Sequence, residues 1–272
     1  MNRRLLILTN DGGKKDFLPG VEHDRDGFLS FFRSCYGGAW EEDEISCTLT
    51  NSMTREVLLQ YFQLVEEQAH VDYWLIVFCG HGGADSHGRT FFELTPGDTP
   101  IYVEEIEKAV NNSRMLLIAD SCRYMPMMES GGRVPRMILF SDSTSMTGYR
   151  DICRTMYNDI ISSTPTNLHI IGYAAHLGQY ARELDNGCGG QYSQALLECA
   201  KSQIDVEIKH RDNSEYVFDG ETASFPWVHS CAKDIVIIRT KGEQTPQLSM
   251  PRTRQLPFWV VPKKIIQFRR KE

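Results

Sequence analysis

Short apolar runs alternate with amphipathic segments along most of this chain, and that order limits the folds open to it. The apolar runs have the length of buried strands, and the segments between them place their apolar residues at helical spacing. Buried strands that alternate with helices predict a mostly parallel sheet covered on both faces, an α/β fold. The expected strands are 3–11, 44–51, 72–80, 114–121, 167–175 and 234–240, and the expected helices are 23–37, 52–69, 102–112 and 190–203.

The length of the chain limits the number of domains, and its net charge limits the kinds of partner that it can bind. A chain of 272 residues can form one large domain or two. The formal net charge of −7 argues against non-specific nucleic-acid binding, which depends on Lys and Arg neutralising phosphates. We therefore expect no nucleic-acid partner, and we interpret the basic residues of 262–272 as a solvated tail rather than a docking patch.

The chain has no pattern typical of export or of a membrane span. Its first apolar stretch is too short for a signal peptide and lacks a small-residue cleavage site, and no apolar run is long enough to cross a bilayer. The eight cysteines are scattered through strand-like and helix-like segments, which favours reduced thiols over a disulfide framework. We expect a soluble, cytoplasmic protein with no membrane partner.

Two polar residues follow neighbouring expected strands. His81 comes directly after 72–80, between glycines, and Cys122 comes directly after 114–121, 41 residues beyond His81. In open parallel sheets, ligands and chemistry gather outside the carboxyl ends of the strands. A lone cysteine there is usually a core residue and a lone histidine a turn residue. The two together favour a catalytic pair.

An imidazole and a thiol at such a place can carry out acyl transfer. The thiolate is the nucleophile, and the imidazole can take the thiol proton and later give one to a leaving amine. Backbone N–H groups in the glycine loop around His81, together with the amide of Cys122, can stabilise an oxyanion. We find no third side chain that must orient His81.

The order of these motifs resembles the caspase-type cysteine proteases, a group that includes caspases, metacaspases, paracaspases and bacterial relatives. "HGG" and "DSCRY" are separated by about as many residues as the catalytic His and Cys motifs of caspases. Both motifs resemble the metacaspase and paracaspase form more than the caspase form. The resemblance implies a three-layer sandwich, in which a central, mostly parallel sheet of about six strands has helices on both faces. Further segments that resemble this group, in the same order, are "FLPGVEHDRDGF", "IIGYAAHLGQYARE", "GGQYSQALLECA" and "GEQTPQLSMP" with "LPFWVV".

The resemblance also implies an activity. It assigns His81 as general base and acid, Cys122 as nucleophile, and the amides of Gly82 and Cys122 as the oxyanion hole. The implied activity is that of a cysteine endopeptidase. The implied biological role is a proteolytic effector in regulated cell death or in bacterial antiviral defence.

Acidic residues are the implied walls of the substrate pocket. Asp120 stands two positions before Cys122, where caspases have a glutamine, and Asp24 matches a pocket aspartate of metacaspase-like proteins. Glu183 takes the place of a caspase arginine. Converging carboxylates repel one another unless a cation arrives, and Arg satisfies them best. We therefore expect cleavage after Arg or Lys at P1, the residue before the cut, and not after Asp.

Each of these assignments has a plainer alternative. An acid taken singly is most simply a solvated surface carboxylate or a helix cap. Asp24 is equally suited to cap a helix that begins near Arg25. Cys79 stands where relatives often have a serine in the pocket wall, and we expect it to act mainly by packing.

The resemblance divides the chain after the cysteine motif. A protease specific for basic P1 residues could cut itself in the arginine-rich segment that follows, above all after Arg133 or Arg136. Pro135 directly follows Val134, and a proline near the scissile bond often blocks cleavage, so an ordered loop without processing is an equal alternative. The implied division is a single domain over 1–272, with a large-subunit-like part over 1–123, an intersubunit-like loop over 124–165 and a small-subunit-like part over 166–272.

Two other classes of function stay open. One is a caspase-like scaffold that binds partners without cutting them. The other is a redox or metal-binding protein that uses Cys79, His81 and Cys122, although a structural zinc site needs a fourth ligand and none has suitable local spacing. No EF-hand-like spacing is present, so we assign no metal or other cofactor, and a calcium requirement is left open by the resemblance. The expected partners are a protein substrate and a separate activating protein.

Overall fold

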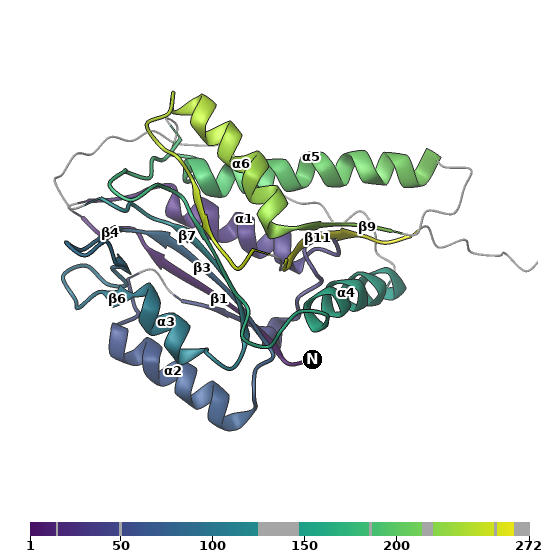
Figure 1. The fold of residues 1–272 in the computed structure, drawn as a ribbon, viewed down its shortest axis with the longest axis horizontal. Helices are drawn as coiled ribbons and strands as arrows, with labels where there is room; N and C mark the ends of the chain where they lie inside the picture. Colours follow the sequence, from purple (N-terminus) through teal and green to yellow (C-terminus); the bar gives the residue numbers. More distant parts are fainter. Residues whose placement is uncertain are drawn as a thin grey trace, which may run out of the picture.

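The main sheet accounts for six strands of the described residues: β1 (Arg3–Asn10), β2 (Ile45–Cys47), β3 (Tyr73–Gly80), β7 (Arg114–Asp120), β8 (His169–Tyr173) and β10 (Gln247–Ser249). The computed structural model describes residues 1–14, 16–48, 51–124, 147–184, 187–213, 220–252 and 255–263. The strand order is β10-β8-β7-β3-β1-β2, and every pairing is parallel except that of β10 with β8. The predicted sheet is therefore confirmed (Figure 1).

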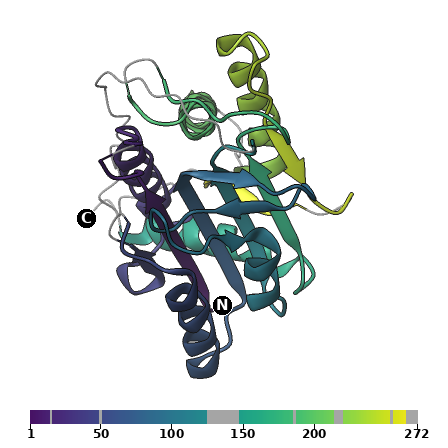
Figure 2. The same cartoon turned by 90° about the vertical axis from the view of Figure 1, so that its left-hand side faces the viewer.

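Helices cover both faces of this sheet, as predicted (Figure 1 and Figure 2). Side chains on one face of β1, β3 and β7 form a core with α1, α4, α5 and α6, and those on the other face form a second core with α2 and α3. No helix in the described ranges has the length and apolar character needed to cross a bilayer. The helices are α1 (Val21–Arg33), α2 (Arg55–Gln68), α3 (Val103–Ala109), α4 (Thr147–Ser162), α5 (Gln191–Asn213) and α6 (Phe225–Arg239).

Short strands form two further sheets that the sequence patterns did not predict. One consists of three strands of two or three residues each and follows β3 directly, so it shapes the loop that begins at His81. The other joins two segments near the end of the chain. These strands are β4 (Gly82–Ala84), β5 (Thr90–Phe92) and β6 (Ile101–Tyr102) in the first sheet, and β9 (Glu221–Ser224) with β11 (Pro257–Val261) in the second.

The strand expected at 234–240 is wrong, because this segment belongs to α6. Its run of β-branched residues has the composition of a buried strand. The helix begins nine residues earlier, at Phe225 after Ser224, with Pro226 in its first turn, where a missing N–H costs nothing. From there Val228, Ala232 and Val236 recur at helical spacing on the buried side. Tertiary packing of that face outweighs the local strand propensity.

The segment 124–165, expected to be an intersubunit-like loop, contains a four-turn helix, α4. Tyr149, Cys153, Tyr157 and Ile161 recur every fourth residue and are all buried in the core. That spacing places them on one face of the helix. Both proposed processing sites, Arg133 and Arg136, lie outside the described residues, so the processing hypothesis stays a prediction.

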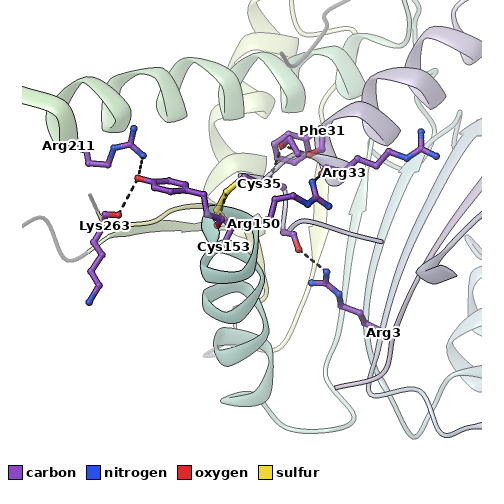
Figure 3. Close-up of a disulfide and its surroundings, with 12 residues drawn as sticks. Arg3, Phe31, Arg33, Cys35, Arg150, Cys153, Arg211 and Lys263 are labelled. Carbon is purple, nitrogen blue, oxygen red and sulfur yellow. Dashed lines mark hydrogen bonds between the residues drawn. A yellow bond between two sulfur atoms is a disulfide. The ribbon is translucent and has the colours of Figure 1, made fainter. Parts of the chain in front are cut away.

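A disulfide joins Cys35, just beyond α1, to Cys153 on α4 (Figure 3). The expectation of reduced thiols throughout is therefore wrong for this pair, and the other six cysteines form no disulfide. The partners are 118 positions apart in the chain, so no local spacing could have indicated the bond. Polar contacts hold α4 to the same region, because Arg150 donates to the carbonyl oxygen of Arg33 at 2.7 Å and Arg154 forms an ion pair with Glu44.

Candidate active site

His81 and Cys122 leave neighbouring strands of the main sheet at the same level. Cys79 on β3 is the direct ladder partner of Asp120 on β7, and the two candidate residues each stand two positions further along. The strand ends are also close in space, since a Cβ built on Gly82 would lie 3.0 Å from the side chain of Ser121. The predicted juxtaposition of the two loops is therefore present in the structure.

The turn into His81 depends on glycine. Gly80 has a φ of +145°, and a Cβ at this position would lie 2.2 Å from the carbonyl oxygen of Asn10 on β1. Only glycine tolerates both conditions. The chain then enters β4, where Gly82 pairs with Phe92. Because Glu93 donates to the carbonyl oxygen of His81 at 3.0 Å, this pair has no direct hydrogen bonds, and the N–H of Gly82 points away from β5.

The imidazole of His81 is oriented by a backbone carbonyl. Its Nε2 lies 2.6 Å from the carbonyl oxygen of Asp16. A carbonyl oxygen only accepts hydrogen bonds, so Nε2 carries the hydrogen and, in the neutral ring, Nδ1 carries the lone pair. Sequence reasoning found no third residue for His81, and none could be found from residue types, because any residue can supply a carbonyl.

The thiol of Cys122 is half-buried beside the loop that follows β8. Its Sγ donates to the carbonyl oxygen of Ala181 at 3.6 Å, and His81 is not among its hydrogen-bond partners within the described residues. Hydrogen bonds between catalytic groups are often long or unformed before a substrate binds. Burial raises the pKa of Cys122 above its usual range, so the resting group is the neutral thiol.

Two of the predicted pocket acids are buried against the start of α5. Asp24 accepts hydrogen bonds from the N–H of Gly190 at 2.7 Å and from the side chain of Gln194 at 2.8 Å. Asp120 accepts one from the N–H of Ser193 at 2.9 Å. Asp24 lies inside the first turn of α1, and the residue that precedes this helix is Gly20, so the alternative of a cap near Arg25 is wrong.

Glycines leave the space that these carboxylates occupy. A Cβ on Gly189 would lie 2.2 Å from Asp24, and one on Gly190 would lie 2.1 Å from Asp120. Both distances are far inside contact range, so any larger residue would displace the acids. Gly189 also has a φ of +106°, which favours glycine for a second reason.

Glu183 and Cys79 complete the cluster. Glu183 accepts a hydrogen bond from the N–H of Gly20 at 2.9 Å, and Cys79 lies 4.0 Å from the hydroxyl of Ser193, both atoms being buried. Burial raises the pKa of Glu183, and the charge of Asp120 adds to that rise. Burial, followed by the charges of Asp24 and Asp120, raises the pKa of Cys79 well above its usual range. The charge of Asp120 therefore raises the pKa of each of the other three pocket residues.

The cluster has no cation of its own among the described residues. None of Asp24, Asp120 and Glu183 forms an ion pair there. The arginines closest in sequence have other partners. Arg25 pairs with Asp26 and Arg182 with Glu243, while Arg123 donates to Thr90 and stacks on the ring of Tyr173. In the described ranges, no three His, Cys, Asp or Glu side chains are arranged to hold a metal ion.

Comparisons with known proteins bear on the fold. No family model and no curated protein matches the sequence. Among solved structures, caspase-1 from Spodoptera frugiperda is similar with a TM-score of 0.54 and 14% identity, over 97% of this chain and 92% of that one. A protein from Geobacter sulfurreducens is similar with a TM-score of 0.54 and 17% identity, over 96% of this chain and 100% of that one. The similarity extends over nearly the whole chain and shows that its fold is caspase-like.

Proposed function

We propose that this protein is a cysteine endopeptidase that cleaves proteins after Arg or Lys, with Cys122 as nucleophile and His81 as general base and acid. The observation that carries the proposal is the position of these two residues at the same level of neighbouring strand ends, beside buried carboxylates without a cation. The caspase-like fold supports it, because chemistry in open parallel sheets gathers at this edge.

The orientation of His81 suits the first chemical step. Nε2 donates to the carbonyl oxygen of Asp16, so Nδ1 is free to take the thiol proton as Sγ of Cys122 attacks the carbonyl carbon of the scissile bond. Because the pKa of Cys122 is raised, the resting thiol needs such a base. The carbonyl oxygen becomes an oxyanion, which the amides of Gly82 and Cys122 would stabilise.

The same imidazole serves the remaining steps. When the C–N bond breaks, Nδ1 of His81 gives its proton to the leaving amine, and an acyl thioester stays on Cys122. Water then attacks the thioester carbon and gives a proton to Nδ1, and the thiol is restored when the acid product leaves. No metal or other cofactor is needed for this sequence.

The acidic cluster supplies the specificity in this proposal. A P1 guanidinium would neutralise carboxylates whose burial already disfavours their charge, and it would bind them with two parallel hydrogen bonds. A P1 ammonium would act as a point charge. A P1 aspartate would add another negative charge to Asp24, Asp120 and Glu183. A role in regulated cell death or antiviral defence, with a separate activating protein, is part of the same proposal and rests on the family resemblance.

A positional peptide library tests the proposal directly. Wild type, Cys122→Ala and His81→Ala are each incubated with the library, with and without calcium. We expect cleavage only by wild type, with Arg or Lys at P1. Equal cleavage by Cys122→Ala would overturn the assignment of the nucleophile, and selection of Asp at P1 would overturn the pocket. Absence of cleavage by wild type in both conditions would favour the scaffold alternative.

A further inference from the structure

The side chain of Asn10 joins the two segments that hold His81. Asn10 is the last residue of β1, the ladder partner of Gly80, and it is fully buried. Its Oδ1 accepts a hydrogen bond from the N–H of Gly12 at 2.8 Å, and its Nδ2 donates to the carbonyl oxygen of Glu93 at 2.6 Å. The N–H of Gly12 can only donate a hydrogen bond, and the carbonyl oxygen of Glu93 can only accept one. These two partners therefore fix which side of the Asn10 amide carries Oδ1 and which carries Nδ2.

Each bridged segment contacts His81 at a different point. Glu93 donates through its N–H to the carbonyl oxygen of His81 and so holds the backbone. Gly12 belongs to the loop of residues 11–14 and 16–18, whose Asp16 carbonyl accepts from Nε2 and so holds the ring. Asn10 is therefore one step from His81 along two separate paths, one to its main chain and one to its imidazole.

Gly12 lies directly over the contact that orients the ring. A Cβ built on it would lie 2.4 Å from Nε2 of His81 and 2.1 Å from the carbonyl oxygen of Asp16. Its φ of +78° is one that glycine adopts readily. With so little space, the position of the Gly12 backbone decides whether the Asp16 carbonyl reaches Nε2. The hydrogen bond from Gly12 to Asn10 fixes that position.

A second asparagine, Asn51, also forms hydrogen bonds with this loop. Asn51 accepts from the N–H of Asp11 at 3.2 Å and donates to its carboxylate at 2.6 Å. The carboxylate of Asp11 also accepts from the N–H of Gly13, and its carbonyl oxygen accepts from Leu18, which closes the loop. Asn10 anchors this loop to the strand that precedes it, and Asn51 anchors it to the segment before α2.

We propose that Asn10 is a positioning residue for His81: its amide holds the Asp16 carbonyl on Nε2 and thereby keeps the lone pair of the neutral ring on Nδ1. The catalytic consequence rests on the proposed function, whereas the effect on the ring does not. A side chain that only fills the core would need neither a donor nor an acceptor here. A carboxylate could accept from Gly12 but would repel the carbonyl oxygen of Glu93.

The test measures the tautomer of His81 and the kinetics separately. The histidines of wild type and Asn10→Ala are labelled with ¹⁵N, and two-dimensional NMR records the tautomer of His81, whose signals are those missing from His81→Gln. We expect the Nε2–H tautomer in wild type and a mixture of tautomers in Asn10→Ala. For an Arg-P1 peptide we expect kcat to fall about 100-fold while KM changes less than about twofold, because orientation and not binding is lost.

The matched control is Asn2→Ala. Asn2 lies just before the opposite end of β1, where its amide donates to the carbonyl oxygen of His70 at 2.8 Å. We expect this variant to keep both the tautomer and the kinetics of wild type. If Asn10→Ala does not fold, Asn51→Gly loosens the same loop, and a φ of +58° at this position suits glycine. We expect Asn51→Gly to show the same mixture of tautomers.

The outcomes separate this inference from the proposed function. A folded Asn10→Ala variant that keeps the Nε2–H tautomer would overturn the inference, and so would a loss of kcat of equal size in Asn2→Ala. If wild type cleaves no peptide but Asn10→Ala still changes the tautomer, the proposed function fails and the inference stands.

Discussion

Asp24 and Asp120 are buried side by side against the first turn of α5, and no cation among the described residues lies between them. Burial, and next the charge of Asp120, raise the pKa of Asp24 well above its usual range. Burial likewise raises the pKa of Asp120, which its hydrogen bonds with Ser193 oppose. Two carboxyl groups held in this way favour the protonated form until a positive charge arrives.

Asp24→Asn should stabilise the protein without substrate. Asparagine can still accept from Gly190, and it can donate to the Gln194 oxygen once that amide turns over. Because the folded-state pKa of Asp24 is raised, its contribution to stability is present below the ordinary carboxyl range near pH 4 and is lost as the pH rises through the raised value. We expect the Tm of the variant to exceed that of wild type by about 2–4 °C at neutral pH.

Thermal unfolding at a series of pH values checks this expectation. The two Tm curves should converge as the pH is lowered towards the ordinary carboxyl range and separate as it rises. Parallel curves would mean that Asp24 titrates no differently in the folded and unfolded chain.

Removing the charge of Asp120 should abolish recognition of basic P1 residues. We expect Asp120→Ala to lose about 100-fold or more in kcat/KM for Arg-P1 peptides, since a buried charged partner is truncated. Asp120→Asn, which keeps an acceptor for the N–H of Ser193, should show the same loss with less effect on folding. Steady-state kinetics with Arg-P1 and Lys-P1 peptides measure the loss. Unchanged turnover in both variants would contradict the assignment of this pocket.

Gly190→Ala should disturb the cluster by contact alone. The added Cβ would lie 2.1 Å from a carboxylate oxygen of Asp120, so the acid or the start of α5 must move. We expect a loss of about 1–3 kcal/mol in the free energy of unfolding. Gly148→Ala is the matched control, because a Cβ there meets nothing within 4 Å. Urea denaturation of both variants measures the difference, and equal stability would show that the site has room to relax.

The disulfide should contribute to stability under oxidising conditions. We expect Cys35→Ser with Cys153→Ser to lower the free energy of unfolding by about 2–4 kcal/mol. A reductant should lower the Tm of wild type and leave that of the double variant unchanged. Cys47→Ser, at an exposed free cysteine, is the control and should behave as wild type does. If the reductant leaves the Tm of wild type unchanged, the disulfide does not form.

Self-processing and an unprocessed loop are the two alternatives for the segment after Cys122, and they predict different masses for the wild-type protein. Wild type and Cys122→Ala are compared by intact-mass measurement under reducing conditions. A smaller wild-type species that ends at Arg133 or Arg136 would support self-processing, and two intact masses that differ only by the Cys122→Ala substitution would exclude it.

Much of the fold followed from local patterns. The strands ending at Gly80 and Asp120 were predictable because long apolar runs with sharp polar stops leave few alternatives. The structure of 234–240 was not predictable, because the helical spacing of buried residues that makes it part of α6 begins before this segment. The helix α4 was not predicted either, because the residues that it contacts, Cys35 and Glu44, lie far away in the sequence.

The candidate site divides in the same way. Side chains with distinctive chemistry could be proposed from the sequence, His81 and Cys122 from their places at strand ends and Asp120 from the family resemblance. The carbonyl of Asp16 and the amide of Asn10 could not. A carbonyl is common to every residue, and an asparagine at a strand end reads as a turn former until its two partners are known.

The bond between Cys35 and Cys153 has a topological consequence. It closes a covalent ring that contains both candidate catalytic residues and both candidate processing sites, Arg133 and Arg136. A single backbone scission anywhere within that ring opens it but releases no fragment. Electrophoresis of a nicked molecule would then show one band without a thiol reagent and two bands with it, so dissociation of the halves would depend on the redox state of the surroundings.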